Sequence, residues 1–126
     1  MIDTLNVEIW GRKFTLKVEY KCYPGECVAQ NQIDAVVRFS RNPQWIDAAK
    51  KNVEEYCRED VENDDENQKK DNIFSYIKPI DIFVKRDNNK PRVAIMCKYR
   101  YDQEHGLAIV FDHNGNVTVG IQDIII

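Results

Sequence analysis

Apolar and polar side chains alternate along the first 22 residues, which is the pattern of β-strands with one buried and one solvated face. The alternation runs over 5–9 and again over 14–22. Gly11-Arg12 lies between the two runs, and a glycine at the first position of a two-residue loop favours a type II′ turn. The pattern therefore predicts an N-terminal β-hairpin.

A helical period replaces the alternation after Pro24-Gly25, a pair that breaks a strand. Two helices are predicted. The first begins at Val28 and ends before Asn42-Pro43, because the residue before a proline avoids the helical region, and the second begins at that pair. Asn42 is the expected N-cap of the second helix, with Pro43 in its first turn. The expected buried faces consist of Ala29, Ile33, Val36, Val37 and Ser40 in the first helix and of Trp45, Ala49, Val53, Tyr56 and Cys57 in the second.

Four more strands are predicted in the second half of the chain. A short apolar link over 73–77 with a single helical turn precedes two alternating runs, over 80–85 and 93–101. The next run, 107–111, is apolar at every position. A strand of this kind is covered on both faces, so it is expected in the centre of the sheet.

A turn over 112–116 sets the register of the last two strands. Asp112 at the start and Gly115 at the left-handed position favour a three-residue loop with a glycine bulge, which pairs Asp112 with Asn116. A two-residue Asn-Gly loop is the alternative, and it buries a more polar set of side chains. The favoured register places Phe111 opposite Val117, Ile109 opposite Val119 and Leu107 opposite Ile121, all on one face.

The predicted element order is β-β-α-α-β-β-β-β. Adjacent hairpins form antiparallel sheet, and two consecutive helices form one layer. We therefore predict a single α+β domain over 1–126, with a six-stranded, mostly antiparallel sheet and two helices packed on one face.

Composition and charge narrow the class of protein. The chain has 126 residues, 21 acidic and 18 basic, for a formal net charge of −3. A nucleic-acid partner is disfavoured, because neutralising phosphates requires a surplus of Lys and Arg. No apolar stretch reaches the roughly 18 residues of a membrane span, and the N-terminus does not have the pattern of a secretion signal. A cytoplasmic location is expected.

The four cysteines are expected to be free thiols. A disulfide between Cys22 and Cys27 around the Pro-Gly turn is the alternative, which a reducing cytosol disfavours. The spacing lacks the paired C-x-x-C pattern of a structural zinc site, and Cys57 and Cys97 lie on apolar faces. No glycine-rich phosphate loop or nucleophile elbow is present, so no cofactor is expected.

A group of polar residues, here called the polar corner, is the first candidate site. The favoured register places Gly106 opposite Gln122 and His105 opposite Asp123, at one end of the sheet. A histidine beside carboxylates suits a general base or a divalent metal site. The alternative is a polar turn that caps strand ends. The polar corner consists of Asp102, Glu104, His105, Gln122 and Asp123.

The almost entirely polar stretch Glu59–Asn72, here called the acidic segment, is the second candidate site. Its composition is that of a solvated loop or a frayed helix end. It has no central glycine, so it does not fit a calcium loop. Its negative charge suits a basic partner. The candidate partner-binding residues are Glu59, Asp60, Glu62, Asp64, Asp65 and Glu66.

The two ends of the chain resemble a group of small bacterial domains of unknown function. The opening G-R-K-F-T-L-K-V-E-Y-K-C-Y-P-G-E resembles their F-x-L-x-V-x-Y strand. The closing E-H-G-L-A-I-V-F and V-G-I-Q-D resemble their E-x-G-x-A…V-G-x-Q-D ending. The resemblance implies a binding role and no known reaction, since some such domains lie near toxin or immunity-like loci. The matching residues of the ending are Glu104, Gly106, Leu107, Ala108, Phe111, Val119, Gly120, Gln122 and Asp123.

These observations favour a small cytoplasmic binding protein with a protein partner. An immunity-like protein that neutralises a basic toxin domain is the leading hypothesis. A small metal-dependent hydrolase, or another enzyme that uses Asp102, Glu104, His105 and Asp123, is the alternative. A homodimer is a third hypothesis, because Ile124-Ile125-Ile126 requires a cover, which either the domain itself or a second copy can supply.

Overall fold

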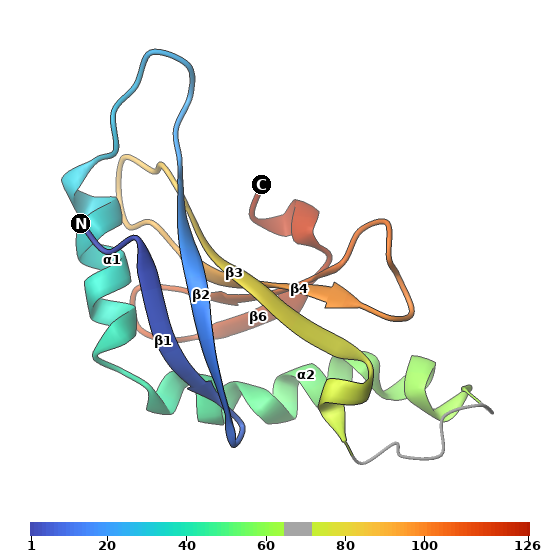
Figure 1. The fold of residues 1–126 in the computed structure, drawn as a ribbon. Helices are drawn as coiled ribbons and strands as arrows, with labels where there is room; N and C mark the ends of the chain where they lie inside the picture. The colour runs from blue at the N-terminus through green and yellow to red at the C-terminus, as the bar shows by residue number, and fades with distance from the viewer. Residues whose placement is uncertain (65–71) are drawn as a thin grey trace.

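The computed structural model describes residues 1–64 and 72–126, and within them six strands form one sheet with two helices (Figure 1). The predicted α+β class and element order are confirmed. None of the helices in these two ranges is long and apolar enough to cross a membrane. The elements are β1 Thr4–Ile9, β2 Arg12–Lys21, α1 Gln30–Ser40, α2 Gln44–Glu62, η1 Ile73–Ser75, β3 Ile77–Lys85, β4 Val93–Tyr99, β5 Leu107–Phe111, β6 Val117–Gly120 and η2 Gln122–Ile124.

The strands lie in the sheet in the order in which they occur in the chain. Every neighbouring pair is antiparallel except β2 and β3, which are parallel and are joined through the two helices. Val36 and Phe39 of α1 and Val53 of α2 share one buried cluster with the side chains of one sheet face, as predicted. We call this face the helix-covered face and the opposite one the open face.

The first hairpin forms as predicted, but its turn is shifted by one residue. Ile9 pairs with Arg12, so the loop residues are Trp10 and Gly11. Both have positive φ, 45° and 91°, which is the signature of a type I′ turn. The predicted Gly11-Arg12 type II′ turn is therefore wrong. The indole of Trp10 donates a hydrogen bond to the carbonyl of Ile46 at 2.8 Å, which holds this unusual conformation in place.

The buried face of α1 differs from the predicted face. Gln32, Val36 and Phe39 are buried, whereas Ser40 is exposed. Phe39 packs against Phe111 of β5 with ring centroids 5.2 Å apart, and burial of such a ring contributes about 2–3 kcal/mol. The buried face of α1 includes Gln32. A prediction from the apolar residues alone therefore places this face about one residue away from its observed position.

Helix α2 is longer than predicted and slightly rotated. Its buried residues are Ile46, Ala49, Val53, Cys57 and Val61. The predicted members of the stripe differ at two positions, since the Trp45 side chain is half-buried and that of Tyr56 is 39% exposed. The N-cap is Pro43 rather than Asn42. The helix continues to Glu62, so the start of the acidic segment is the end of a helix, which was one of its two predicted structures.

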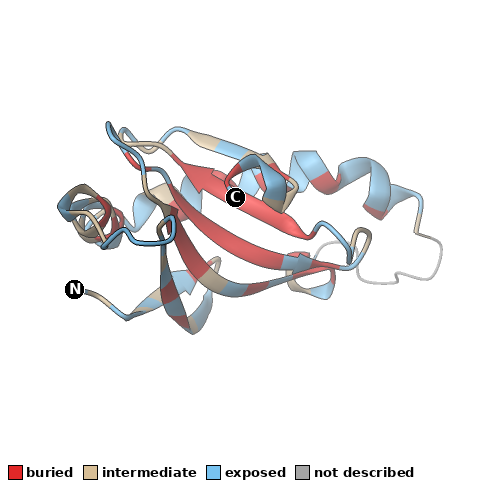
Figure 2. Cartoon of the chain, turned by 90° about the horizontal axis from the view of Figure 1, so that it is seen from above, coloured by how far each residue is buried: buried red, intermediate tan, exposed pale blue. Residues whose placement is uncertain are grey.

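Strand β5 is buried at every position, as predicted, although it lies next to the edge strand β6 and not in the centre. Its helix-covered side belongs to the main core. Its other side joins a smaller cluster with Phe83, Met96 and Ile125. Ile125, next to η2 in the C-terminal tail, is only 4% exposed, and Figure 2 shows this tail lying over the open face of the sheet. The tail therefore supplies the cover that lets an off-centre strand be buried on both faces.

The predicted register of the last hairpin is confirmed up to Gly120, where β6 ends, so the predicted pair of Leu107 with Ile121 is not part of the ladder. Phe111 pairs with Val117 and Ile109 with Val119, and the amide of Asp112 donates to the carbonyl of Asn116 at 3.0 Å. One irregularity interrupts the preceding strands, a bulge between Pro79 and Asp81. The bulge leaves Ile80 39% exposed, outside the alternation in which the sequence placed it.

Candidate functional site

The polar corner is built on the tight turn that links β4 to β5. The Asp102 carboxylate accepts a hydrogen bond from the backbone amide of His105 at 3.1 Å. It also lies 3.0 and 3.1 Å from Nδ1 of the His105 ring, which donates when Nδ1 carries the proton. The amide of Gly106 donates to the Asp102 carbonyl at 2.9 Å. Asp102 thus organises the whole turn, as aspartate does in many turns.

The two side chains of this turn shift each other's titration. The backbone hydrogen bond from His105, aided by the histidine ring, lowers the pKa of Asp102. The hydrogen bond to Asp102, followed by the negative charge of that carboxylate, raises the pKa of His105. The His105 side chain is 43% exposed, so water screens the pair. The pair is an exposed histidine whose ring is oriented by a carboxylate.

Gln122 ties the corner to the end of β4. Its amide donates to the carbonyl of His105 at 3.1 Å, and its side-chain Nε2 donates to the carbonyl of Cys97 at 3.1 Å. Gly106 lies between these partners with φ of 62°, and a Cβ placed there would be 2.6 Å from Nε2 of Gln122 and 2.9 Å from the carbonyl oxygen of Cys97. The absence of a side chain at residue 106 is what lets Gln122 reach β4.

The structure brings the predicted corner residues together only in part. Strand β6 ends at Gly120, and it is Gln122 rather than Asp123 that lies against His105. The predicted pairing of His105 with Asp123 is therefore wrong, because the chain turns into η2 at Gln122. Glu104 and Asp123 act on His105 through their charges, which raise its pKa, and no hydrogen bond or ion pair joins them to it in the described part of the chain.

The polar corner does not contain a cluster of side chains that could bind the predicted metal ion, within the described residues. Within residues 1–64 and 72–126, no three His, Cys, Asp or Glu side chains come close enough to hold a metal ion. What remains at the corner is the Asp102–His105 pair. A ring oriented through Nδ1 leaves Nε2 as the nitrogen that can exchange protons with a ligand.

A groove of about 460 Å³ lies on the open face beside the corner. Glu104, Gly106 and Gln122 line its corner side, whereas Asp102 and His105 do not line it. Asp81 lines it as well, and the Oδ1 atom of Asp81 is buried without a hydrogen-bond partner among the described residues. Burial, followed by the charge of Glu19, raises the pKa of Asp81.

The acidic segment is divided between internal and outward roles. The hydroxyl of Tyr99 donates to Asp60 at 2.5 Å, and the hydroxyl of Tyr101 donates to Asp64 at 2.6 Å. Asp60 and Asp64 therefore hold the end of α2 against β4 and the following turn. Glu59 and Glu62 are exposed on α2. The remaining candidates, Asp65 and Glu66, lie outside the described residues.

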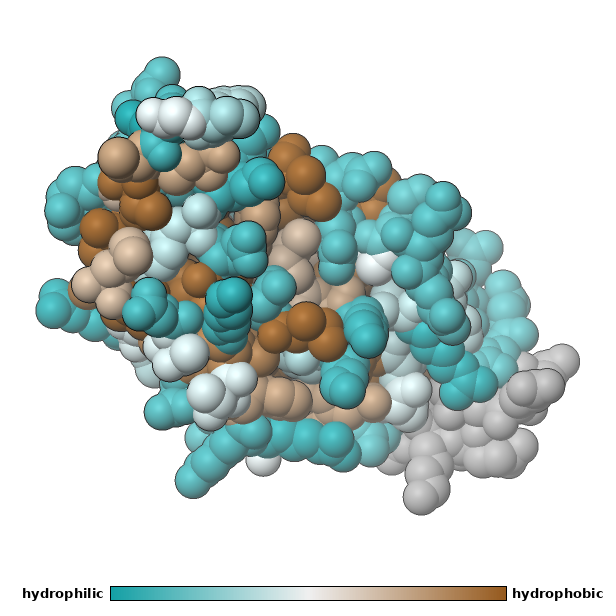
Figure 3. All heavy atoms as spheres, turned by 45° about the horizontal axis from the view of Figure 1, so that its top comes forward, coloured by the Kyte–Doolittle hydropathy of each residue, from teal (hydrophilic) through white to brown (hydrophobic). Residues whose placement is uncertain are grey.

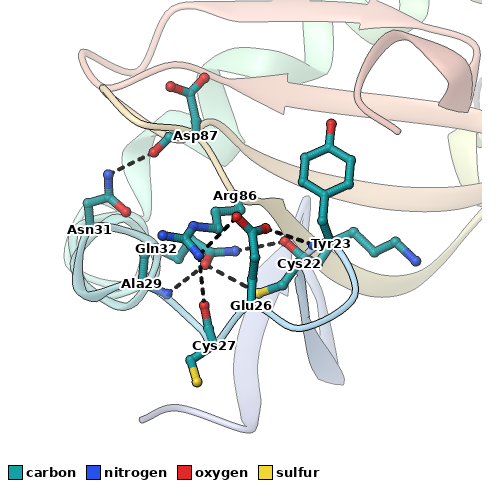
Figure 4. Close-up of polar contacts among 10 residues, drawn as sticks. Cys22, Tyr23, Glu26, Cys27, Ala29, Asn31, Gln32, Arg86 and Asp87 are labelled. Atoms are coloured by element: carbon teal, nitrogen blue, oxygen red, sulfur yellow. Dashed lines mark hydrogen bonds and ion pairs between the residues drawn. The ribbon is translucent and has the colours of Figure 1, made fainter.

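Gln32 is a buried polar residue that the sequence analysis missed. Its side chain is 0% exposed and lies at the centre of the contacts shown in Figure 4. Nε2 donates to the carbonyls of Lys21 and Val84, each at 3.1 Å, and Oε1 accepts from the amide of Ala29 at 2.8 Å. The available signal was a glutamine four residues before Val36 and seven before Phe39, in the apolar stripe of α1.

The loop after β2 carries two of the four thiols (Figure 4). All four cysteines are free in the structure, as the sequence predicts. The Cys22 thiol lies 3.7 Å from Oε1 of Gln32, and Cys27 is exposed. Arg86 fastens the loop, since its guanidinium pairs with Glu26 at 3.2 Å and donates to the carbonyl of Cys27 at 3.3 Å.

Comparison with known families identifies the chain over almost its whole length. The family model described as "Domain of unknown function (DUF6985)" matches residues 2–126. The chain belongs to the DUF6985 family. Neither the curated proteins nor the solved structures contain a match.

The polar ending that the sequence analysis singled out now has a structural explanation in this DUF6985 domain. Gly106 and Gln122 interlock at the corner. Gly120 leaves room for Ile124, since a Cβ at residue 120 would lie 3.0 Å from that side chain. Phe111 is buried in the core. These four positions secure the tail and the sheet, so their residue types follow from packing.

Proposed function

We propose that this domain is a protein-binding module that presents the outer face of α2 to a basic partner. The observation that carries the proposal is the segregation of charge along the chain. Helix α2, Gln44–Glu62, contains six acidic and three basic residues, a formal charge of −3, whereas the rest of the chain contains 15 residues of each sign. Charge gathered on one element steers and orients an oppositely charged partner.

The outer face of α2 is preorganised for such contacts. Glu54, Glu55, Glu59 and Glu62 are exposed on it. The opposite side of the helix is buried, and the hydrogen bond from Tyr99 to Asp60 holds its last turns. A rigid helix loses less conformational entropy on binding than a loop does, so more of the contact energy remains for affinity.

The same face carries features of a contact surface besides charge. Tyr56 is 39% exposed, and tyrosine is enriched among the residues that dominate binding energy. A separate groove of about 400 Å³ lies against α2, and Tyr56 does not line it. Its lining has three acidic residues, Glu54, Glu55 and Glu62, and two basic ones, Lys51 and Arg58. A basic side chain of the partner can pair there with one of the glutamates.

The finer assignment is that the partner is a basic toxin domain and that binding suppresses it in the cytoplasm, as in an immunity protein. Free thiols at all four cysteines suit a reducing compartment. The sequence resemblance to domains near immunity-like loci supports the same assignment.

The test compares Glu55→Lys/Glu59→Lys with Asp3→Lys/Asp34→Lys, which changes the net charge equally but lies away from α2. Proteins captured from the source cells are identified, and the affinity of each purified candidate is measured by calorimetry at several salt concentrations. We expect a basic partner that binds the wild type and the control, loses at least tenfold in affinity with the α2 variant, and weakens as salt rises. Equal binding by both variants would refute the proposal.

A further inference from the structure

We propose that a groove between η1, the start of β3 and the end of β4 binds the phosphate group of a small phosphorylated ligand. We call it the cationic groove. Its volume is about 400 Å³, within the roughly 300–1,000 Å³ of small-molecule sites. Its charged lining residues are Lys78, Lys98 and Arg100, and no acidic residue of the described ranges lines it. This site shares Tyr76 with the groove beside α2, but its charged residues lie on β3, on β4 and directly after β4, and their charge has the opposite sign.

The two lysines of the cationic groove are placed against each other by the sheet. Lys78 of β3 and Lys98 of β4 are directly opposite cross-strand partners, and both are exposed. No ion pair engages either lysine within the described ranges. Like charges at directly opposite positions destabilise an antiparallel pair. An anion held between the two ammonium groups converts this repulsion into attraction, so the arrangement favours a bound anion.

Arg100 adds a third cation with the geometry that phosphate recognition uses. Its guanidinium lies 3.4 Å from the Asp64 carboxylate and 5.8 Å from the centre of the Tyr101 ring, which fix its position. A guanidinium has five N–H donors in a planar fork, so the contact with Asp64 leaves donors for an anion. Together with the Asp64 carboxylate, the three cations leave a formal charge of +2, which matches a phosphate monoester dianion better than a single carboxylate.

The rest of the lining suits an organic part next to the phosphate. Phe74, which is half-buried, contributes aromatic surface, whereas Tyr76 and Tyr99 line the groove but are only 5% and 3% exposed. Ser75 and Gln103 contribute polar groups. A planar ring attached to the phosphate can lie on the aromatic surface. The neighbouring groove on the open face shares Lys98 with the cationic groove, but its three acidic residues, Glu19, Asp81 and Glu104, outnumber its two lysines and disfavour an anion there.

The test measures by NMR and calorimetry whether the protein binds three probes: adenosine 5′-monophosphate, inorganic phosphate and adenosine. We expect both phosphates to bind and to shift the backbone amide signals of Lys78, Lys98 and Arg100, while adenosine binds at least tenfold more weakly than the monophosphate. Lys78→Gln and Arg100→Gln should each weaken phosphate binding at least tenfold. Lys90→Gln, which removes an exposed lysine outside the groove, should leave the affinity for phosphate unchanged.

Three outcomes would overturn the proposal. They are the absence of binding by both phosphates, equal affinity for adenosine and its monophosphate, and equal weakening by Lys90→Gln and Lys78→Gln. None of them bears on the α2 partner test, which uses different residues and a different ligand.

A stability measurement gives an independent readout. Lys78→Glu replaces the repulsion with Lys98 by an ion pair, so we expect a higher urea midpoint than that of the wild type in chloride buffer. Phosphate stabilises folded proteins in general, so at equal ionic strength replacing chloride with phosphate should raise every midpoint, but the rise should be larger for the wild type and Lys90→Glu than for Lys78→Glu. A lower midpoint for Lys78→Glu in chloride would mean that Lys78 serves the fold, and it would contradict the proposal.

Discussion

Gly106 and Gln122 form an interlocked pair, in which the side-chain amide of Gln122 occupies the space that a Cβ at residue 106 would fill. Gly106→Ala brings a methyl group into this space and places alanine at φ of 62°. We expect the free energy of unfolding to fall by roughly 2–3 kcal/mol, from backbone strain together with loss of the Gln122 hydrogen bond to β4. Urea denaturation measures the change.

Gly11→Ala is the matched control for this clash. Gly11 also has a positive φ, 91°, but nothing lies within 4 Å of a Cβ added there. Gly11→Ala therefore introduces the backbone strain of a positive φ without a steric clash, and the free energy of unfolding should fall by about 1 kcal/mol. Equal losses at residues 106 and 11 would show that the Gln122 contact contributes nothing to stability.

Gln32→Leu should be among the most damaging substitutions in α1. The leucine fills the space but removes the partner of the Ala29 amide and one donor to each of the carbonyls of Lys21 and Val84, of which the Lys21 carbonyl keeps the amide of Arg86 at 2.8 Å. Buried polar groups without a partner cost about 1–3 kcal/mol each, so we expect a loss of about 2–4 kcal/mol in denaturation experiments. Gln30→Leu, at an exposed position of the same helix, should change stability by less than about 0.5 kcal/mol. A fully stable Gln32→Leu variant would contradict this account of the buried glutamine.

The Asp102–His105 pair predicts a defined pH dependence. The pKa of His105 is raised above 6.5, so its stabilising effect is present below pH 6.5 and is lost as the pH rises through the raised value. The pKa of Asp102 is lowered below 3.8, so its effect is present above pH 3.8 and is lost as the pH falls through the lowered value. The pair should therefore stabilise the turn most between these two transitions.

NMR titration of the histidine ring signals measures this effect directly. We expect Asp102→Asn to lower the pKa of His105, because the main cause of its elevation is removed. A His113→Gln variant assigns the two histidine signals. A His105 titration that is unchanged in Asp102→Asn would rule out the pair as the origin of the shift.

Thiol reactivity should divide the four cysteines into two classes. Cys27 is exposed and Cys22 is partly exposed, whereas Cys57 and Cys97 are buried. Burial raises the pKa of Cys57 to about 11 and also raises the pKa of Cys97, so both lack the reactive thiolate at neutral pH. With a thiol reagent at pH 7.5, the first two should react quickly and the other two only on unfolding. Mass spectrometry of the labelled peptides identifies them, and fast labelling of Cys97 would contradict the burial.

Several elements were predictable because their signals are local. The alternation before and after the first turn required strands, and the Asp112–Asn116 loop chemistry set the register of β5 and β6. The position of the first turn was predicted wrongly. Turn preferences placed it at Gly11-Arg12, whereas the loop residues are Trp10 and Gly11. The indole of Trp10 bonds to a carbonyl of α2 that is distant in sequence, and no local pattern contains that contact.

The candidate site was less predictable than the fold, because it depends on contacts between distant segments. The sequence correctly predicted that the turn before β5 meets the segment after β6 at one end of the sheet, but it matched His105 with the wrong residue, since η2 begins where a strand was expected. It marked the acidic segment as outward-facing, whereas Tyr99 and Tyr101 turn two of its carboxylates inward. It gave no sign that Lys78 and Lys98 are neighbours.

The sequence by itself determined the class, order and approximate limits of the elements, because the spacing of apolar side chains follows the geometry of a helix or a strand within a few residues. Only the tertiary structure decided which polar groups are buried, paired or left facing one another. Gln32, Asp60 and Lys78 are ordinary surface residue types, and their roles come from partners 20 or more residues away in the chain. Hydrogen bonds and charges act through space, so their partners are fixed only when the sheet brings distant strands together.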